Sequence, residues 1–157
     1  MDASKGQLLC LFDEGFDHKA WHGTTLLGSL RGMTAAHATK RPGHGRHNIW
    51  ELVVHAAYWK YAVRRRLTGE KRGSFACEGS NWFERPASAA GRERAFAADV
   101  RLLVDEHRKL REVIAGLSPR QLSRRVPGKP YSAAWMIRGI AAHDLYHAGQ
   151  IQLLKRL

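Results

Sequence analysis

Four separate segments carry an apolar residue at every third or fourth position, and this period is the feature that most constrains the fold. It is the period of an α-helix with one buried face, whereas no segment sustains the alternation typical of strands. The segments span about residues 20–31, 48–67, 92–115 and 131–157. Four such helices bury their apolar faces against one another, so the sequence predicts an all-α four-helix bundle with long connections.

Capping residues mark the ends of the last three helices, whereas the start of the first is uncertain. In the first, Trp21, Leu26, Leu27 and Leu30 supply the apolar positions, although glycines interrupt them, and residues 7–16 are compatible with a separate turn. Asn48 is an expected N-cap and Gly69 an expected end for the second. Gly116 ends the third, and Ser132 caps the fourth.

Length and composition bound the class of protein. A chain of 157 residues is long enough for one domain with a sizeable core, so we expect a single domain over 1–157. With 44% hydrophobic and 25% charged residues it is typical of soluble globular proteins. No apolar run is long enough to cross a membrane and the first ten residues do not resemble a secretory signal, so we expect no membrane partner and a cytoplasmic location.

Two further counts narrow the partners. Cys10 and Cys77 stand alone, so neither a cysteine zinc site nor a disulfide framework is indicated. The net charge of +12 would attract acidic small molecules or nucleic acid. Because the basic residues are scattered along the chain, a solvated surface is the preferred interpretation, a small anionic substrate fits it, and nucleic acid is an unlikely partner.

A long connection and an internal similarity organise the middle of the chain. Residues 70–91 are rich in Gly, Ser and charge but include Phe75, Trp82 and Phe83, which predicts an anchored loop of the kind that covers a site. The segments LRGMTAAHATKRPG and IAGLSPRQLSRRVPG resemble each other and precede the second and fourth helices. In each of those helices a Trp precedes a His, so a degenerate duplication would place His55 and His143 at related positions in the bundle.

The histidines carry the strongest chemical signal. His143 and His147 stand four apart on the apolar face of the last helix, the spacing at which two imidazoles grip one metal ion. His55, in the apolar stripe of the second helix, is the best candidate for a third ligand. Three imidazoles leave an open coordination position, which is typical of a catalytic site. The alternative is that these are core histidines satisfied by hydrogen bonds.

Several other residues are candidates for the surroundings of such a site. His22 would line the pocket or carry protons, with a surface position as the alternative. Trp59 would pack in the core or at its rim, or would close the cavity over the metal. Gln150 would reach a polar group there. Asp144 takes the place of the Glu of zinc proteases but is shorter, so we expect it to face outward or to support a ligand. His107, on the inner stripe of the third helix, is expected to be a buried packing or hydrogen-bonding residue.

At these residues the chain resembles the DinB-like (DinB/YfiT-like) four-helix-bundle metalloproteins. The resemblance rests on GIAAHDLYHAGQIQLLKRL, HNIWELVVHAAYWKYAVRRRLTG, AWHGTTLLGSL, NWF and the Pro-Gly before the last helix. It implies that His55, His143 and His147 bind a divalent metal. It also implies homodimers, which are frequent in the family, and an enzyme that uses a low-molecular-weight thiol, since characterised relatives include thiol S-transferases and an isomerase.

Three functions remain open at this point. A metal-dependent hydrolase or thiol S-transferase would activate water or a thiol at the open position. A binding or sensor module would hold the metal without catalysis, and a nucleic-acid binder would use the positive charge. Zinc and nickel are the expected metals, with iron and copper as alternatives, because imidazole suits all four.

Overall fold

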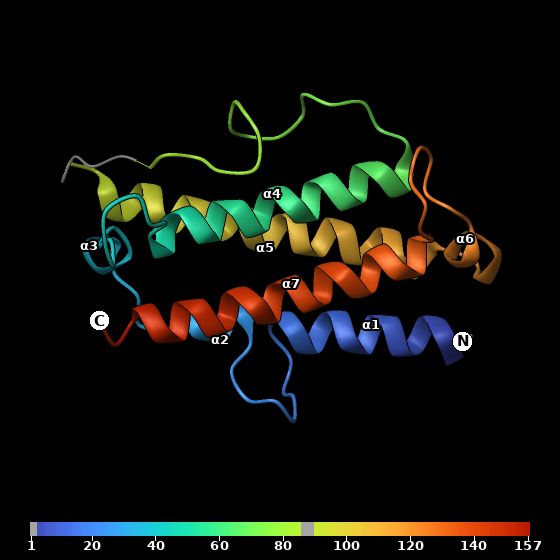
Figure 1. Ribbon diagram of the computed structural model, residues 1–157, viewed down its shortest axis with the longest axis horizontal. Helices are drawn as coiled ribbons and strands as arrows, with labels where there is room; N and C mark the ends of the chain where they lie inside the picture. The colour runs from blue at the N-terminus through green and yellow to red at the C-terminus, as the bar shows by residue number, and fades with distance from the viewer. Residues whose placement is uncertain (1–2, 86–89) are drawn as a thin grey trace.

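Four long helices run along one axis in the computed structural model of the protein, which describes residues 3–85 and 90–157 (Figure 1). They are α1 (Ala3–Phe16), α4 (Ile49–Thr68), α5 (Arg92–Gly116) and α7 (Ala133–Leu154). Three short helices lie in the connections: α2 (Leu26–Ser29), α3 (Ala35–Ala38) and α6 (Pro119–Ser123). No β-strand is present in the described ranges, so the predicted all-α four-helix bundle is confirmed.

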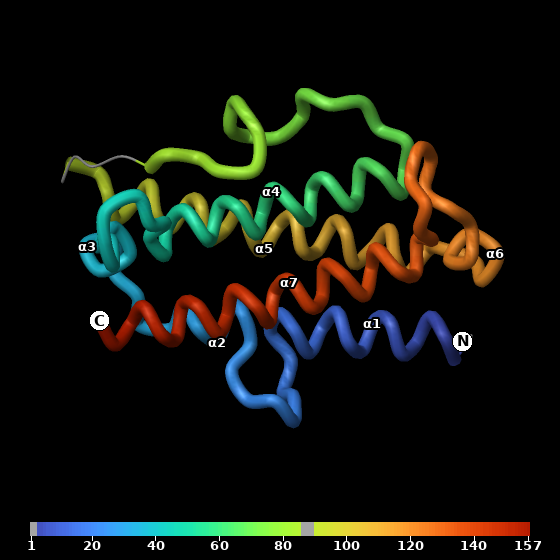
Figure 2. The backbone as a smooth tube through the Cα atoms, in the orientation of Figure 1, coloured from blue at the N-terminus to red at the C-terminus, as the bar shows by residue number. Residues whose placement is uncertain are grey.

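The order of the helices places α4 beside α7. As Figure 2 shows, α1 and α7 run in one direction and α4 and α5 in the other. Because α4 and α5 are parallel, the chain has to return along the bundle between them, and residues 70–85 do so on the outer side of α4 (Figure 1). One long crossover of this kind is a known variant of the four-helix bundle.

The predicted caps of α4 and α7 and the predicted ends of α4 and α5 are confirmed, whereas α7 ends at Leu154, three residues before its predicted end. The Asn48 side chain accepts a hydrogen bond from the Glu51 amide at 2.8 Å and caps α4, whose other end is Gly69 at a φ of 81°. α5 ends at Gly116, and the Ser132 hydroxyl accepts from the Trp135 amide at 3.2 Å to cap α7. The two similar segments also share local structure, since Thr34 and Ser118 cap α3 and α6.

The prediction for the first long helix is wrong in position. That helix is α1, which buries Leu8, Leu9, Phe12 and Phe16 on one face. Residues 20–25 are not helical, because Gly23 takes a φ of 100° and Thr25 starts the short helix α2. Trp21, expected to pack inward, is fully exposed.

The core is divided by a polar layer halfway along the bundle. One apolar cluster holds Trp50, Phe96 and Ile151, and the other holds Phe12, Leu110 and Ile137. Buried polar residues lie between the two clusters along α4, α5 and α7, namely Lys60, Glu106, His107, Asp144 and His147. His55 lies beside this layer, among the last α4 residues of the first cluster. Buried polar groups need partners, so this layer is where a site is to be sought.

No helix of the described chain is long and apolar enough to cross a membrane.

Candidate metal centre

The helices α4 and α7 bring three imidazoles together at the polar layer. His143 and His147 lie one turn apart on α7, and His55 faces them from α4. The Nε2 atom of His143 lies 3.2 Å from Nε2 of His55 and 3.0 Å from Nε2 of His147. The ligand atoms of all three lie within 4.8 Å of one another, so the three side chains can share one ion.

Two of the three rings are oriented by hydrogen bonds at Nδ1. The Nδ1–H of His55 donates to the backbone oxygen of Asn81 at 2.7 Å, and that of His147 donates to the side-chain oxygen of Gln150 at 2.6 Å. A proton held at Nδ1 leaves a lone pair at Nε2, which is the tautomer that binds a metal through Nε2. Both rings therefore point lone pairs at the centre of the cluster.

The third ring, His143, cannot satisfy the hydrogen-bonding capacity of the cluster. A proton on Nε2 of His143 can serve one neighbouring lone pair but not both, and Nδ1 of His143 has no hydrogen-bond partner in the described chain. The side chains alone thus leave at least one buried nitrogen unpaired, which costs free energy. A cation at the centre would satisfy all three Nε2 atoms at once.

Burial keeps the imidazoles neutral. It lowers the pKa of His55 to about 4 and that of His143 to about 3, and it lowers the pKa of His147 as well. The positive charge that each ring would carry adds to the effect for His55 and His143. Neutral imidazole is the form that ligates metals, so no proton has to be displaced from Nε2 near neutral pH.

The predicted covering loop does lie over the site. The Trp82 ring stacks on His55 with centroids 3.8 Å apart, and the His47 ring stacks on the same indole at 3.5 Å. Asn81 stands at a φ of 68°, in the left-handed region, while its side-chain oxygen accepts from Trp59 Nε1 at 2.9 Å. The loop thereby supplies both a hydrogen bond and a hydrophobic cover to His55.

Of the candidates for the surroundings, the structure brings Trp59 and Gln150 to the site and leaves His22 outside it. His22 is exposed in the loop after α1, with Nε2 3.2 Å from the backbone oxygen of Glu14, because the first helix does not extend to it. Its predicted surface alternative is the one found. His107 is buried between the rings of Phe12 and Phe16, as expected of a packing residue.

The expectation that Asp144 faces outward is wrong. Asp144 is fully buried and pairs with Lys60, which is also fully buried. It makes no hydrogen bond to the three histidines, since it lies on the side of α7 that faces Phe12 and Phe16, the rings nearest to the Lys60 ammonium. Sequence reasoning missed Lys60, although a lone lysine between Trp59 and Tyr61 in a buried helix was a signal for such a pair.

Two cavities flank the cluster. One has a volume of about 150 Å³ and reaches His143; the other has about 500 Å³ and reaches His147 beside Trp82 and Gln150. His143 is also the least buried of the three ligands, being half-buried. A small molecule therefore has a route to the cluster from either side.

Comparison with known protein families gives a match over most of the chain. The model of the family described as "DinB superfamily" matches residues 19–151 of the chain. No curated protein and no solved structure matches it significantly.

Proposed function

The chain belongs to the DinB superfamily, and we propose that it is a metal-dependent enzyme in which His55, His143 and His147 bind one divalent transition metal ion. The observation that carries the proposal is the convergence of the three Nε2 atoms with no proton arrangement that satisfies them all. Three imidazoles on a tetrahedral ion stand about 3.4 Å apart for metal–nitrogen bonds of about 2.1 Å. The two separations at His143, 3.2 Å and 3.0 Å, need only a small adjustment to reach that value.

The remaining residues would position the ligands and limit access to them. Asn81 and Gln150 hold the tautomers of His55 and His147, and Trp82 shields His55 from water. Three protein ligands leave a coordination position for a small molecule, and the two cavities are routes to it. A metal bound in this way lowers the pKa of a water or thiol that it coordinates, so that the nucleophilic form is present near neutral pH.

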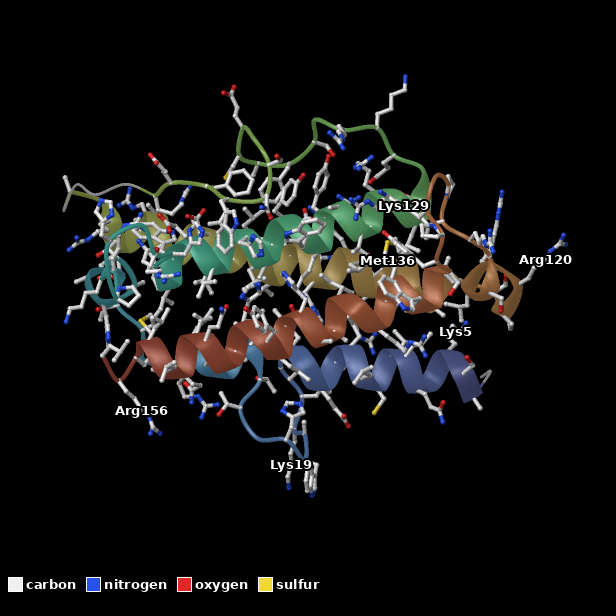
Figure 3. The ribbon with its side chains drawn as sticks, viewed as in Figure 1. Lys5, Lys19, Arg120, Lys129, Met136 and Arg156 are labelled. Atoms are coloured by element: carbon white, nitrogen blue, oxygen red, sulfur yellow. The ribbon has the colours of Figure 1, made fainter. Side chains whose placement is uncertain are left out.

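Zinc and nickel are the proposed metals, and hydrolysis or transfer to a low-molecular-weight thiol is the proposed chemistry. A closed structural site, as in a sensor, would hold four protein ligands, whereas the described chain gathers only three. This favours the enzyme over the non-catalytic module. The labelled basic residues do not gather on one face: Lys5 and Arg120 lie towards one end of the bundle, Arg156 at the other and Lys19 in the loop after α1 (Figure 3). This distribution argues against a nucleic-acid interface, and the net charge of +12 would suit an anionic small molecule.

Elemental analysis of protein purified without a His tag tests the metal. We expect about one zinc or nickel ion per chain in the wild type, none in His143→Ala, and the wild-type content in the control His22→Ala, which removes a histidine outside the cluster. A wild type that stays metal-free after supplementation would overturn the proposal.

Activity assays test the chemistry. The loaded protein is tested for replacement of chloride in 1-chloro-2,4-dinitrobenzene by a low-molecular-weight thiol and for hydrolysis of 4-nitrophenyl acetate. We expect at least one activity that disappears in His55→Ala, His143→Ala and His147→Ala and persists in His22→Ala. Activity retained in the metal-free variants would exclude the proposed mechanism, and a metal-loaded protein inactive in both assays would favour the non-catalytic module.

A further inference from the structure

The smaller cavity beside the cluster is a groove between α4 and α7. Its walls are Trp59, Val63 and Arg66 of α4 and Trp135, Met136 and Ile140 of α7, with His143 at one end. Met136, labelled in Figure 3, marks the position of the groove near the start of α7. Gly139 also lines it, and a Cβ placed there would meet no atom within 4 Å. The groove therefore has free space at Gly139, and a larger side chain at this position would fill it.

The floor of the groove is suited to an apolar body. Apart from Arg66 and His143 its lining residues are apolar, and the polar nitrogen of Trp59 is already bonded to Asn81. A dry cavity of about 150 Å³ lined by apolar side chains can hold a benzene-sized ring. This groove has the same volume, about 150 Å³, but is open to solvent on one side, so it can seat such a ring without enclosing it.

Arg66 gives the groove a charge without a counter-ion. It is half-buried, its guanidinium carbon lies 5.5 Å from the Trp59 ring centre, and it makes no ion pair with any residue of the described ranges. Its neighbour Arg64, by contrast, is paired with Glu70 and Glu106. A planar guanidinium held against an indole, with its donors free, is a favourable partner for the oxygens of a carboxylate, sulfonate or phosphate.

We infer that this groove binds the substrate of the proposed enzyme, a molecule with a ring-sized apolar body and an anionic group at Arg66. The inference rests on the proposed function for the reacting end, which would lie at His143. The Arg66 guanidinium carbon lies 5.5 Å and the His143 ring centre 6.3 Å from the centre of the Trp59 ring, so an apolar body packed on Trp59 can direct its anionic group to Arg66 and its reacting atom to His143. The larger cavity carries no such argument, because its one arginine, Arg46, is exposed.

The test uses 3-phenylpropane-1-sulfonate as a probe and the full chain as purified. Sulfonates coordinate metal ions weakly, so the probe reports on Arg66 rather than on the metal. Binding is followed by the indole N–H signals of Trp59 and Trp135 in proton–nitrogen NMR spectra, with the fully buried Trp50 as the internal reference. We expect the first two signals to shift at millimolar probe, and 3-phenylpropan-1-ol to bind about fivefold more weakly.

Two variants and two matched controls locate the site. Arg66→Gln should weaken sulfonate binding about fivefold and leave the alcohol unaffected, whereas Arg101→Gln, which removes the same charge from an exposed position on α5, should change neither. Gly139→Leu should abolish binding of both probes by filling the groove. Gly149→Leu makes the same change on α7 where a Cβ also meets nothing within 4 Å, outside the groove, and should leave both intact.

Each contrary result overturns the inference. These results are unshifted Trp59 and Trp135 signals, equal affinities for sulfonate and alcohol, or sulfonate binding that survives Arg66→Gln. A dimer in sedimentation whose interface excludes both probes would assign the groove to a second copy of the chain instead. Metal content is measured separately, so a metal-free protein that binds the sulfonate through Arg66 would retain the groove and overturn the proposed function alone.

Discussion

Neighbouring residues of α7 belong to two polar clusters that adjoin each other in the bundle and differ in charge balance. Asp144 pairs with Lys60 beside the Phe12 and Phe16 rings, and both members are fully buried. His143 faces His55 and His147 beside open cavities. The ion pair contains its own cation, whereas the histidines present lone pairs with no cation among the described residues.

This difference indicates different roles. Burial raises the pKa of Asp144 and lowers that of Lys60, but each charge holds the other in place, so the pair is complete within the protein. Such pairs contribute to folding only while both members are present. The histidine cluster becomes complete only when a ligand is added, so its contribution to folding should depend on metal.

The largest expected effect comes from breaking the ion pair. Asp144→Asn keeps the volume but leaves the Lys60 ammonium buried without a counter-charge, and should lower the free energy of unfolding by about 3–5 kcal/mol. The double variant Lys60→Met, Asp144→Asn should recover most of that loss. Urea unfolding of the wild type, both single variants and the double variant measures the coupling. A loss below about 1 kcal/mol, the range of exposed pairs, would show that the two clusters do not differ in this way.

The next effect concerns metal affinity. Gln150→Leu removes the acceptor that orients His147 and should weaken zinc binding about 10- to 100-fold with little change in the stability of the metal-free protein. Competition with a chromogenic chelator measures the affinity. Gln152→Leu is the matched control, since Gln152 contacts Thr24 rather than the cluster, and its zinc affinity should equal that of the wild type. Equal affinities in all three proteins would remove Gln150 from the site.

Acid should destabilise the metal-free protein through its buried histidines. Burial lowers the pKa of His107 to about 2, from an ordinary value of 6.5. Above pH 6.5 the residue is neutral in both the folded and the unfolded chain and does not affect stability. Below pH 6.5 only the unfolded chain takes up a proton there, so the unfolding free energy falls as the pH falls. From pH 8 to pH 5.5 the loss should be about 1.4 kcal/mol for each such histidine. The His107→Phe variant retains the stacking with Phe12 and Phe16, and its unfolding free energy should fall by about 1.4 kcal/mol less than that of the wild type over this pH range. Parallel pH profiles of unfolding free energy for the wild type and His107→Phe would show that His107 is not responsible for the acid sensitivity.

The comparison also marks how far the sequence could predict the molecule. The three histidines were predictable because their spacing and apolar neighbours place them on two inward faces, and three long helices followed from their period and caps. The first helix was misplaced because Leu26 and Leu30, which are buried by α2 and its C-cap, imitate the stripe that belongs to Leu8, Phe12 and Phe16.

Contacts between distant segments were beyond the periodic signal. Lys60 and Asp144 are 84 residues apart, so their pairing depends on how α4 and α7 pack. The hydrogen bond from His55 to Asn81 uses a backbone oxygen, which every residue carries, and so leaves no trace in residue type. The sequence Asn81-Trp82-Phe83 contributed to the family resemblance, but the resemblance predicted no contact between this segment and the histidines.

The smallest effect on the unfolding free energy is expected for a substitution of His143 in protein from which metal has been removed with a chelator. His143→Leu removes an unpartnered Nδ1 and a crowded Nε2 and replaces them with apolar atoms of similar volume, so the unfolding free energy should change by less than about 1 kcal/mol. Zinc should then raise the unfolding temperature of the wild type but not of the variant, because only a folded state that binds the ion is stabilised by it. A loss of about 3–5 kcal/mol without metal, as for Asp144→Asn, would mean that the histidines stabilise the fold by themselves, and that the cluster needs no cation.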